Sequence, residues 1–184
     1  MRVLGIDPGL GRCGVAVVEG RAGSLRLVLA DCLETDAAEG DGLRLLDLSR
    51  RLCQLAGDLH PDVAAVERLF FSTNRATAMR VSEARGVILC AMAGAGVPVV
   101  EYTPNEVKES VAGYGAATKH QVMRMTASLL GVERIAGPDD TADACAVAIC
   151  HHHRAGLQRG MPPAGATGVS PALEAAVAAA RAAR

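Results

Sequence analysis

The chain has 184 residues, a length typical of one domain with or without a terminal tail. Half of the residues are hydrophobic and 21% are charged, which is an ordinary balance for a globular protein with a core. No apolar run approaches the ~20 residues that a membrane helix needs, and the first residues lack an apolar signal segment. We therefore expect neither a membrane span nor secretion. The net charge of −1 gives no indication of an overall preference for acidic partners, so binding to nucleic acid would depend on local patches of positive charge.

The cysteine and aromatic content further limits the functional classes to which the protein could belong. Six cysteines are scattered along the chain without a CxxC pair. This pattern favours reduced thiols in a cytoplasmic protein over a disulfide framework or a zinc site. The chain has no Trp, two Phe and two Tyr. A protein that binds single strands by stacking bases on an aromatic platform is therefore disfavoured.

Strand patterns come first along the chain. Apolar and alternating runs predict strands over residues 2–7, 14–18 and 25–33, with a turn between the last two. The spacing of the apolar residues then changes to that of a helix. Leucines at this spacing from Gly42 onward predict an amphipathic helix that ends at Pro61.

Strands and helices alternate in the rest of the pattern. Further strands are predicted over residues 62–66 and 97–102, and helices over 74–95, 104–111, 118–130 and from Pro138 to the histidines at 151–153. Three consecutive strands followed by this alternation predict an α/β fold. Its mixed sheet has an antiparallel meander that leads into parallel strands, and helices flank it.

Composition divides the chain after residue 154. Ala, Gly and Pro make up 18 of the 30 residues from 155 to 184, and this segment has a net charge of +2. Such a composition has little apolar surface to bury. We therefore expect a folded domain over 1–154 and a disordered tail over 155–184.

Two carboxylates stand at the ends of predicted buried strands. Asp7 ends the first strand before Pro8, and Glu67 directly follows an apolar run. Open α/β sheets bind ligands at the carboxyl ends of their strands, and a charge there is costly unless a cation pairs with it. The alternative interpretations are a turn carboxylate for Asp7 and a salt bridge between Glu67 and Arg68.

A second pair of carboxylates opens the last predicted helix. Asp140 and Asp143 are three residues apart and therefore point to one face. Helix capping is the alternative interpretation for Asp139 and Asp140, but Asp143 precedes an apolar face that must pack inward. Three segments thus supply up to four carboxylates. Their combined charge of about −4 would balance two Mg²⁺ ions, which take hard oxygen ligands in two-metal phosphoryl chemistry.

Five short motifs occur in a fixed order. They are Gly5-Ile-Asp7-Pro-Gly9, Val66-Glu67-Arg68-Leu-Phe70, Glu106-Val-Lys108, Lys119-His-Gln-Val122 and Asp140-Thr-Ala-Asp143-Ala. Together they resemble the RuvC-type Holliday junction resolvases over roughly residues 1–154. The resemblance implies a ribonuclease H-like fold, a homodimer and magnesium-dependent nicking of two symmetry-related strands of a four-way DNA junction in recombination and repair. It also implies two Mg²⁺ ions per subunit, for which Mn²⁺ can substitute, and cooperation with the RuvA and RuvB branch-migration proteins.

The resemblance assigns the acidic residues to metal binding and catalysis. They are Asp7, Glu67, Asp140 and Asp143, and the spacing to Asp143 favours Asp140 over the neighbouring Asp139.

Basic and aromatic residues are assigned to DNA binding. Lys108 and Lys119 match positions that resemble phosphate-contacting lysines, and Lys119 is included in the catalytic set. Phe70 is expected to act as a wedge that stacks on or unstacks a base at the branch point, with core packing as the alternative for Phe70 or Phe71. Arg75 belongs to a stretch with an excess of basic residues, for which simple solvation is the alternative.

Two further predictions concern helices. Part of the helix over 74–95 is expected to form the dimer interface through apolar residues, which are Ala76, Met79, Ala84, Val87, Ile88 and Ala91. The histidines at 151–153 cannot all reach one zinc ion, because adjacent helical residues point about 100° apart. They are interpreted as a cluster at a helix C-terminus that is compatible with the helix dipole.

Two other functional classes are considered. Actin-like phosphotransferases also begin a strand with Gly-x-Asp-x-Gly, but they need two such domains, for which 184 residues are too few. A non-catalytic junction-binding relative would have no reason to keep four carboxylates near DNA phosphates.

Overall fold

The computed structural model describes residues 1–68 and 75–158, and within them five strands form one sheet in the order β3-β2-β1-β4-β5. The strands are β1 (Arg2–Asp7), β2 (Arg12–Arg21), β3 (Ser24–Glu34), β4 (Val63–Glu67) and β5 (Val99–Tyr102). The first three strands pair antiparallel, whereas β4 pairs parallel with β1 and β5 pairs parallel with β4. The mixed sheet predicted from the sequence is confirmed.

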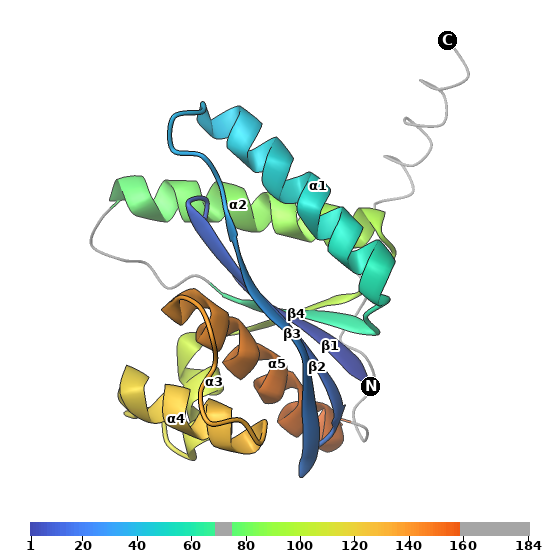
Figure 1. Ribbon diagram of the computed structural model, residues 1–184, viewed down its shortest axis with the longest axis vertical. Helices are drawn as coiled ribbons and strands as arrows, with labels where there is room; N and C mark the ends of the chain where they lie inside the picture. The colour runs from blue at the N-terminus through green and yellow to red at the C-terminus, as the bar shows by residue number, and fades with distance from the viewer. Residues whose placement is uncertain (69–74, 159–184) are drawn as a thin grey trace.

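Helices cover both faces of this sheet (Figure 1). They are α1 (Asp41–Leu59), α2 (Arg75–Gly94), α3 (Pro104–Ala112), α4 (Lys119–Leu129) and α5 (Asp139–Gln158). Helices α1 and α2 pack on one face and α3, α4 and α5 on the other, so the protein has two apolar cores separated by the sheet. None of the helices that the structure describes combines the length and the hydropathy needed to cross a bilayer.

Helix α5 lies unusually close to the central strand β1. A Cβ atom at Gly5 would stand 2.1 Å from the carbonyl oxygen of Ala144, so only glycine permits this approach. The face of α5 that meets the sheet is made of small residues such as Ala144 and Ala148, which are fully buried. This tight contact holds the first turn of α5 at the carboxyl end of β1.

Threonine caps fix the starts of α3 and α4. The Thr103 and Thr118 side chains accept hydrogen bonds from the backbone N–H groups of Glu106 and Gln121, and the latter two side chains accept bonds from the threonine N–H groups. These are reciprocal capping boxes. The cap at Thr118 places Lys119 in the first turn of α4.

Helix α5 continues past the boundary expected at residue 154 and ends at Gln158. The rest of the expected tail, residues 159–184, lies outside the described residues. The helical pattern of α5 therefore extends four residues into the segment whose composition suggested a tail.

The three histidines lie inside α5, so their interpretation as a C-terminal cluster that complements the helix dipole is wrong. The Tyr102 hydroxyl lies 2.8 Å from His151 Nδ1, and His152 Nε2 donates a hydrogen bond to the Val18 carbonyl at 3.1 Å. His153 Nδ1 lies 2.9 Å from the Ser110 carbonyl oxygen. Burial lowers the pKa of His151 to about 4 and also lowers the pKa of His152. Neither ring therefore carries a charge at neutral pH.

Helix α2 offers a partner less apolar surface than the sequence suggested. Ala84, Ile88 and Ala91 are buried in the core shared with α1. Met79 is 65% exposed and Val87 is only partly buried. Much of the apolar character of α2 therefore serves the fold of the subunit itself, because α1 covers that side of the helix.

Candidate active site

Asp7 and Glu67 lie at the carboxyl ends of two neighbouring parallel strands. The register of β1 and β4 pairs Ile6 with Val66, so the next residue of each strand stands at the same edge of the sheet. The two carboxyl groups are close enough for the charge of Glu67 to raise the pKa of Asp7. Two like charges in one buried site oppose each other, which favours a proton on one of the two groups.

The electrostatics identify Asp7 as the group that keeps the proton. Burial raises the pKa of Asp7 to about 8, and the charges of Glu67, Asp143 and Asp140 add to the rise. Burial also raises the pKa of Glu67, with the charge of Asp143 as the next cause. The site therefore has more negative charge than its own residues compensate at neutral pH.

Asp140 reaches the same edge through the contact between α5 and β2. Asp7 pairs with Gly14 in the register of β1 and β2, and the Asp140 backbone lies directly on Gly14. Arg12 Nε stands 3.1 Å from Asp140 Oδ2. Even so, this oxygen is buried and accepts no hydrogen bond of acceptable geometry. It is a buried oxygen whose capacity to accept a hydrogen bond is not met by the ion pair with Arg12.

Lys119 joins two carboxylates of α5. Its Nζ atom lies 3.0 Å from Asp143 Oδ2 and 3.3 Å from Asp139 Oδ2. Burial by itself lowers the pKa of Lys119, but the hydrogen bonds and charges of Asp143 and Asp139 outweigh it and raise that pKa. Burial raises the pKa of Asp143, and the contact with Lys119 only partly offsets this. Within residues 1–68 and 75–158, Lys119 is the cation that forms an ion pair with Asp143.

The four predicted ligands fit a divalent cation by chemistry and charge. They offer carboxylate oxygens, which Mg²⁺ prefers, and they include the buried oxygen of Asp140 that accepts no hydrogen bond. Among residues 1–68 and 75–158, no three His, Cys, Asp or Glu side chains are already arranged around a single ion. Asp143 Oδ2 is paired with Lys119. A cation that took this oxygen as a ligand would compete with the lysine for it.

The predicted DNA-binding residues are placed unequally. Lys108 lies on α3, where it is partly buried, and its charge acts on the carboxyl of Glu67. Phe70 lies outside the described residues. Arg75 begins α2, but its side chain and that of Ala76 lie outside what the structure describes.

Three residues of the site were not assigned to it from the sequence. Arg12 and Asp139 form ion pairs that depend on segments distant in the chain, and no local pattern signals them. Gly14 offered a signal, because a glycine inside a strand pattern often marks the close approach of another backbone.

Sequence comparisons identify the family of the chain. The family model described as "Crossover junction endodeoxyribonuclease RuvC" matches residues 3–151. A protein of that name from Moorella thermoacetica is 51% identical over 151 residues, which cover 82% of this chain and 90% of the relative. Another from Chloroflexus aggregans is 50% identical over 155 residues, which cover 84% of this chain and 94% of the relative.

Solved structures give the same assignment. The structure of Thermus thermophilus RuvC in complex with Holliday junction substrate is similar with a TM-score of 0.81 and 34% identity, covering 85% of this chain and 96% of that one. The yeast mitochondrial Holliday junction resolvase Ydc2 shares the fold, with a TM-score of 0.63 at 15% identity and coverage of 83% and 78% of the two chains. The protein thus has the expected ribonuclease H-like fold and belongs to the RuvC family of crossover junction endodeoxyribonucleases.

Proposed function

We propose that this protein is a structure-selective endonuclease that resolves four-way DNA junctions by hydrolysing one phosphodiester bond in each of two strands. The observation that carries the proposal is the meeting of Asp7, Glu67, Asp140 and Asp143 at one edge of a sheet of the RuvC family. The Thermus relative supports it, because its structure was solved with a Holliday junction substrate. Homologous recombination and DNA repair produce such junctions.

The acidic residues would hold two Mg²⁺ ions per subunit, with Mn²⁺ able to substitute. Bound ions would supply Lewis-acid stabilisation of the attacking and leaving oxygens of the phosphodiester. The chain itself supplies a cluster of carboxylates in which burial and repulsion raise the pKa of Asp7 to about 8. Such a cluster repels a DNA phosphate unless cations neutralise it. Divalent cations are therefore expected to be needed for close approach of the substrate as well as for hydrolysis.

The lysines would hold the strand that is cut. Lys119 stands at the start of α4, where free backbone N–H groups also favour a phosphate. Lys108 lies close enough to act on Glu67 and therefore borders the same edge. Phe70 and Arg75 complete the proposed DNA-binding set. Phe70 is proposed from the sequence resemblance as the wedge at the branch point, and Arg75 from the excess of basic residues around it.

The symmetry of a four-way junction also favours a particular oligomeric state of the protein. Symmetric nicking of a four-way junction requires two active sites related by a two-fold axis, which a homodimer provides. The exposed Met79 side of α2 is the proposed part of that interface, and RuvA and RuvB are the proposed branch-migration partners. Sedimentation with and without junction DNA tests the dimer, and a monomer under both conditions at micromolar concentration would contradict it.

Cleavage of a synthetic four-way junction, compared with a linear duplex of the same sequence, tests the activity. We expect paired nicks in the junction with Mg²⁺ and none with a chelator. Asp7→Asn should lower turnover by at least about 100-fold while junction binding persists, because only the ligands of the cation change. Asp58→Asn removes an exposed carboxylate from α1 and serves as the matched control. Binding without cleavage by the wild type would identify a non-catalytic junction-binding protein instead.

A further inference from the structure

The ion pair of Lys119 raises a question about the proposed cation site. Lys119 Nζ lies 3.0 Å from Asp143 Oδ2, so the lysine and a divalent cation would compete for this carboxylate. If Asp143 turned to a cation without any other change, the lysine would lose its closest counter-charge. A bare ammonium group would then stand beside a divalent cation and oppose its binding.

Asp139 offers the lysine a second position. Asp139 and Asp143 are four residues apart on α5 and therefore share a face of the helix. Asp139 Oδ2 is 3.3 Å from Lys119 Nζ, so the lysine already contacts both carboxylates. The Asp139 side chain is 62% exposed, against 29% for Asp143. Asp139 thus lies on the outer side of the pair.

The charges around the site also favour a pairing of Lys119 with Asp139 when Asp143 binds a cation. Lys119, Arg12 and Lys108 each bring one positive charge close to the carboxylates proposed as ligands, and these charges oppose the binding of divalent cations. Asp139 offsets the charge of Lys119 with its own negative charge. Its exposed position places that charge next to the lysine, at the rim of the cluster.

We propose that Asp139 is a positioning residue that retains the Lys119 ammonium when Asp143 turns to a bound divalent cation. This inference rests on the proposed function. Asp139 makes Asp143 available as a ligand and keeps the lysine at the edge of the site, where it can meet a phosphate. Asp139 itself touches neither the cation nor the DNA in this proposal.

Calorimetric titration of Mn²⁺ into the full chain without DNA tests the proposal by a measurement independent of cleavage. We expect Asp139→Asn to weaken Mn²⁺ binding by roughly two- to fivefold, the range of one exposed ion pair, because Lys119 then competes more strongly for Asp143. In a Lys119→Ala background the same substitution should lose most of its effect. Asp139→Glu should restore binding, since it returns the charge.

Glu133→Gln is the matched control, because it removes an exposed carboxylate from the connection between α4 and α5. It should leave Mn²⁺ binding nearly unchanged in both backgrounds. Thermal unfolding of each variant establishes that it is folded at the temperature of the titration.

The outcomes separate this inference from the proposed function. If Asp139→Asn weakened Mn²⁺ binding equally in the wild type and in the Lys119→Ala variant, Asp139 would act only through the long-range electrostatic effect of its charge. The positioning role would then be wrong. No weakening in the presence of Lys119 would also overturn it. In both cases wild-type binding of Mn²⁺ would leave the proposed function intact. Absence of Mn²⁺ binding to the wild type would overturn both proposals.

Discussion

Gly14 of β2 lies directly against Asp140 at the start of α5: a Cβ atom at Gly14 would stand 1.9 Å from the carbonyl oxygen of Asp140. Gly14 is also the residue that pairs with Asp7 across β1 and β2. One small residue therefore brings a carboxylate from the last helix to a carboxylate from the first strand. The acidic site depends on this packing contact as much as on the acidic residues themselves.

Gly14→Ala should therefore damage both stability and activity. The added methyl group must push the first turn of α5 outward, and we expect a loss of about 1–3 kcal/mol in the free energy of unfolding. Cleavage should fall at temperatures where the variant is still folded, because Asp140 moves with the helix. Urea unfolding and junction cleavage measure the two effects. Gly57→Ala, at an exposed position of α1 with open space around it, should instead preserve activity and slightly raise stability.

The proton on Asp7 predicts how the metal-free protein responds to pH. The pKa of this carboxyl is raised from 3.8 to about 8 by burial and by its acidic neighbours. The folded state therefore holds a proton that the unfolded state has released, so its contribution to stability is lost as the pH rises through 8. Between about pH 6.5 and 8 we expect a loss on the order of 1 kcal/mol in a chelator-treated sample.

Asp7→Asn should flatten this slope, because an amide does not titrate. Urea unfolding at several pH values measures it, and added Mg²⁺ should flatten it in the wild type by replacing the proton. A slope that is the same in the wild type and in Asp7→Asn would place the titrating group elsewhere.

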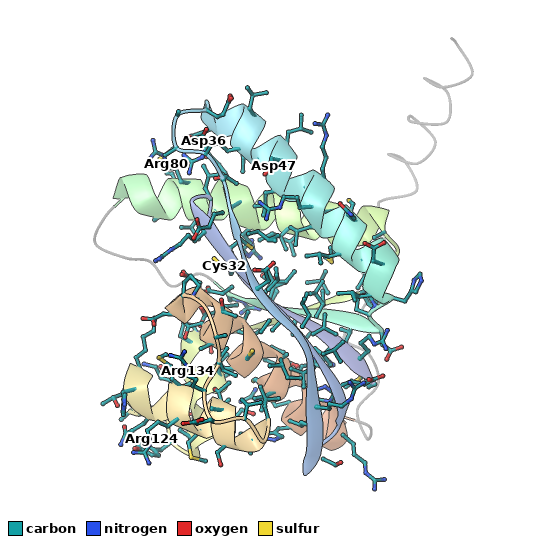
Figure 2. All side chains as sticks on the ribbon, viewed as in Figure 1. Cys32, Asp36, Asp47, Arg80, Arg124 and Arg134 are labelled. Atoms are coloured by element: carbon teal, nitrogen blue, oxygen red, sulfur yellow. The ribbon has the colours of Figure 1, made fainter. Side chains whose placement is uncertain are left out.

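Lys119 and Arg124 provide a comparison of two cations on one helix. Lys119 contacts Asp143, whereas Arg124 is exposed on the outer side of α4, away from the sheet (Figure 2). We expect Lys119→Ala to slow cleavage by at least about tenfold, since it removes a positive charge next to the developing negative charge. Arg124→Ala should change the rate by less than about twofold. Single-turnover rates at saturating protein and Mg²⁺ make the comparison, and equal rates near that of the wild type would assign Lys119 to the surface.

The buried histidines predict sensitivity to acid. Burial lowers the pKa of His151 to about 4, with the charge of His152 as the smaller cause. A lowered histidine pKa contributes stability above the unfolded value of 6.5, and that stability is lost as the pH falls towards 4. We expect the midpoint of thermal unfolding to fall over this range. The fall should be smaller in His151→Gln and unchanged in His120→Gln, an exposed position on α4.

The sequence by itself predicted the elements of the fold and their order. Hydrophobic periodicity predicted the strands and helices, because each element buries particular faces and the spacing of its apolar residues shows which faces these are. The helix predicted over 118–130 is α4 (Lys119–Leu129), and its start is set by a capping box whose residues are only three positions apart. Asp7 and Glu67 were proposed as site residues because a charge at the end of an apolar strand conflicts with its surroundings.

Only the tertiary structure decided which groups meet. The ion pairs of Lys119 with Asp139 and of Arg12 with Asp140 join segments that are distant in the chain, so no spacing predicts them. The sequence likewise does not show that His151 is neutral, because its lowered pKa follows from burial beside Tyr102. The local sequence pattern indicates whether a residue lies on a buried or an exposed face of its element. Its pKa and its ion pairs depend on which residues from other segments the fold packs against that face.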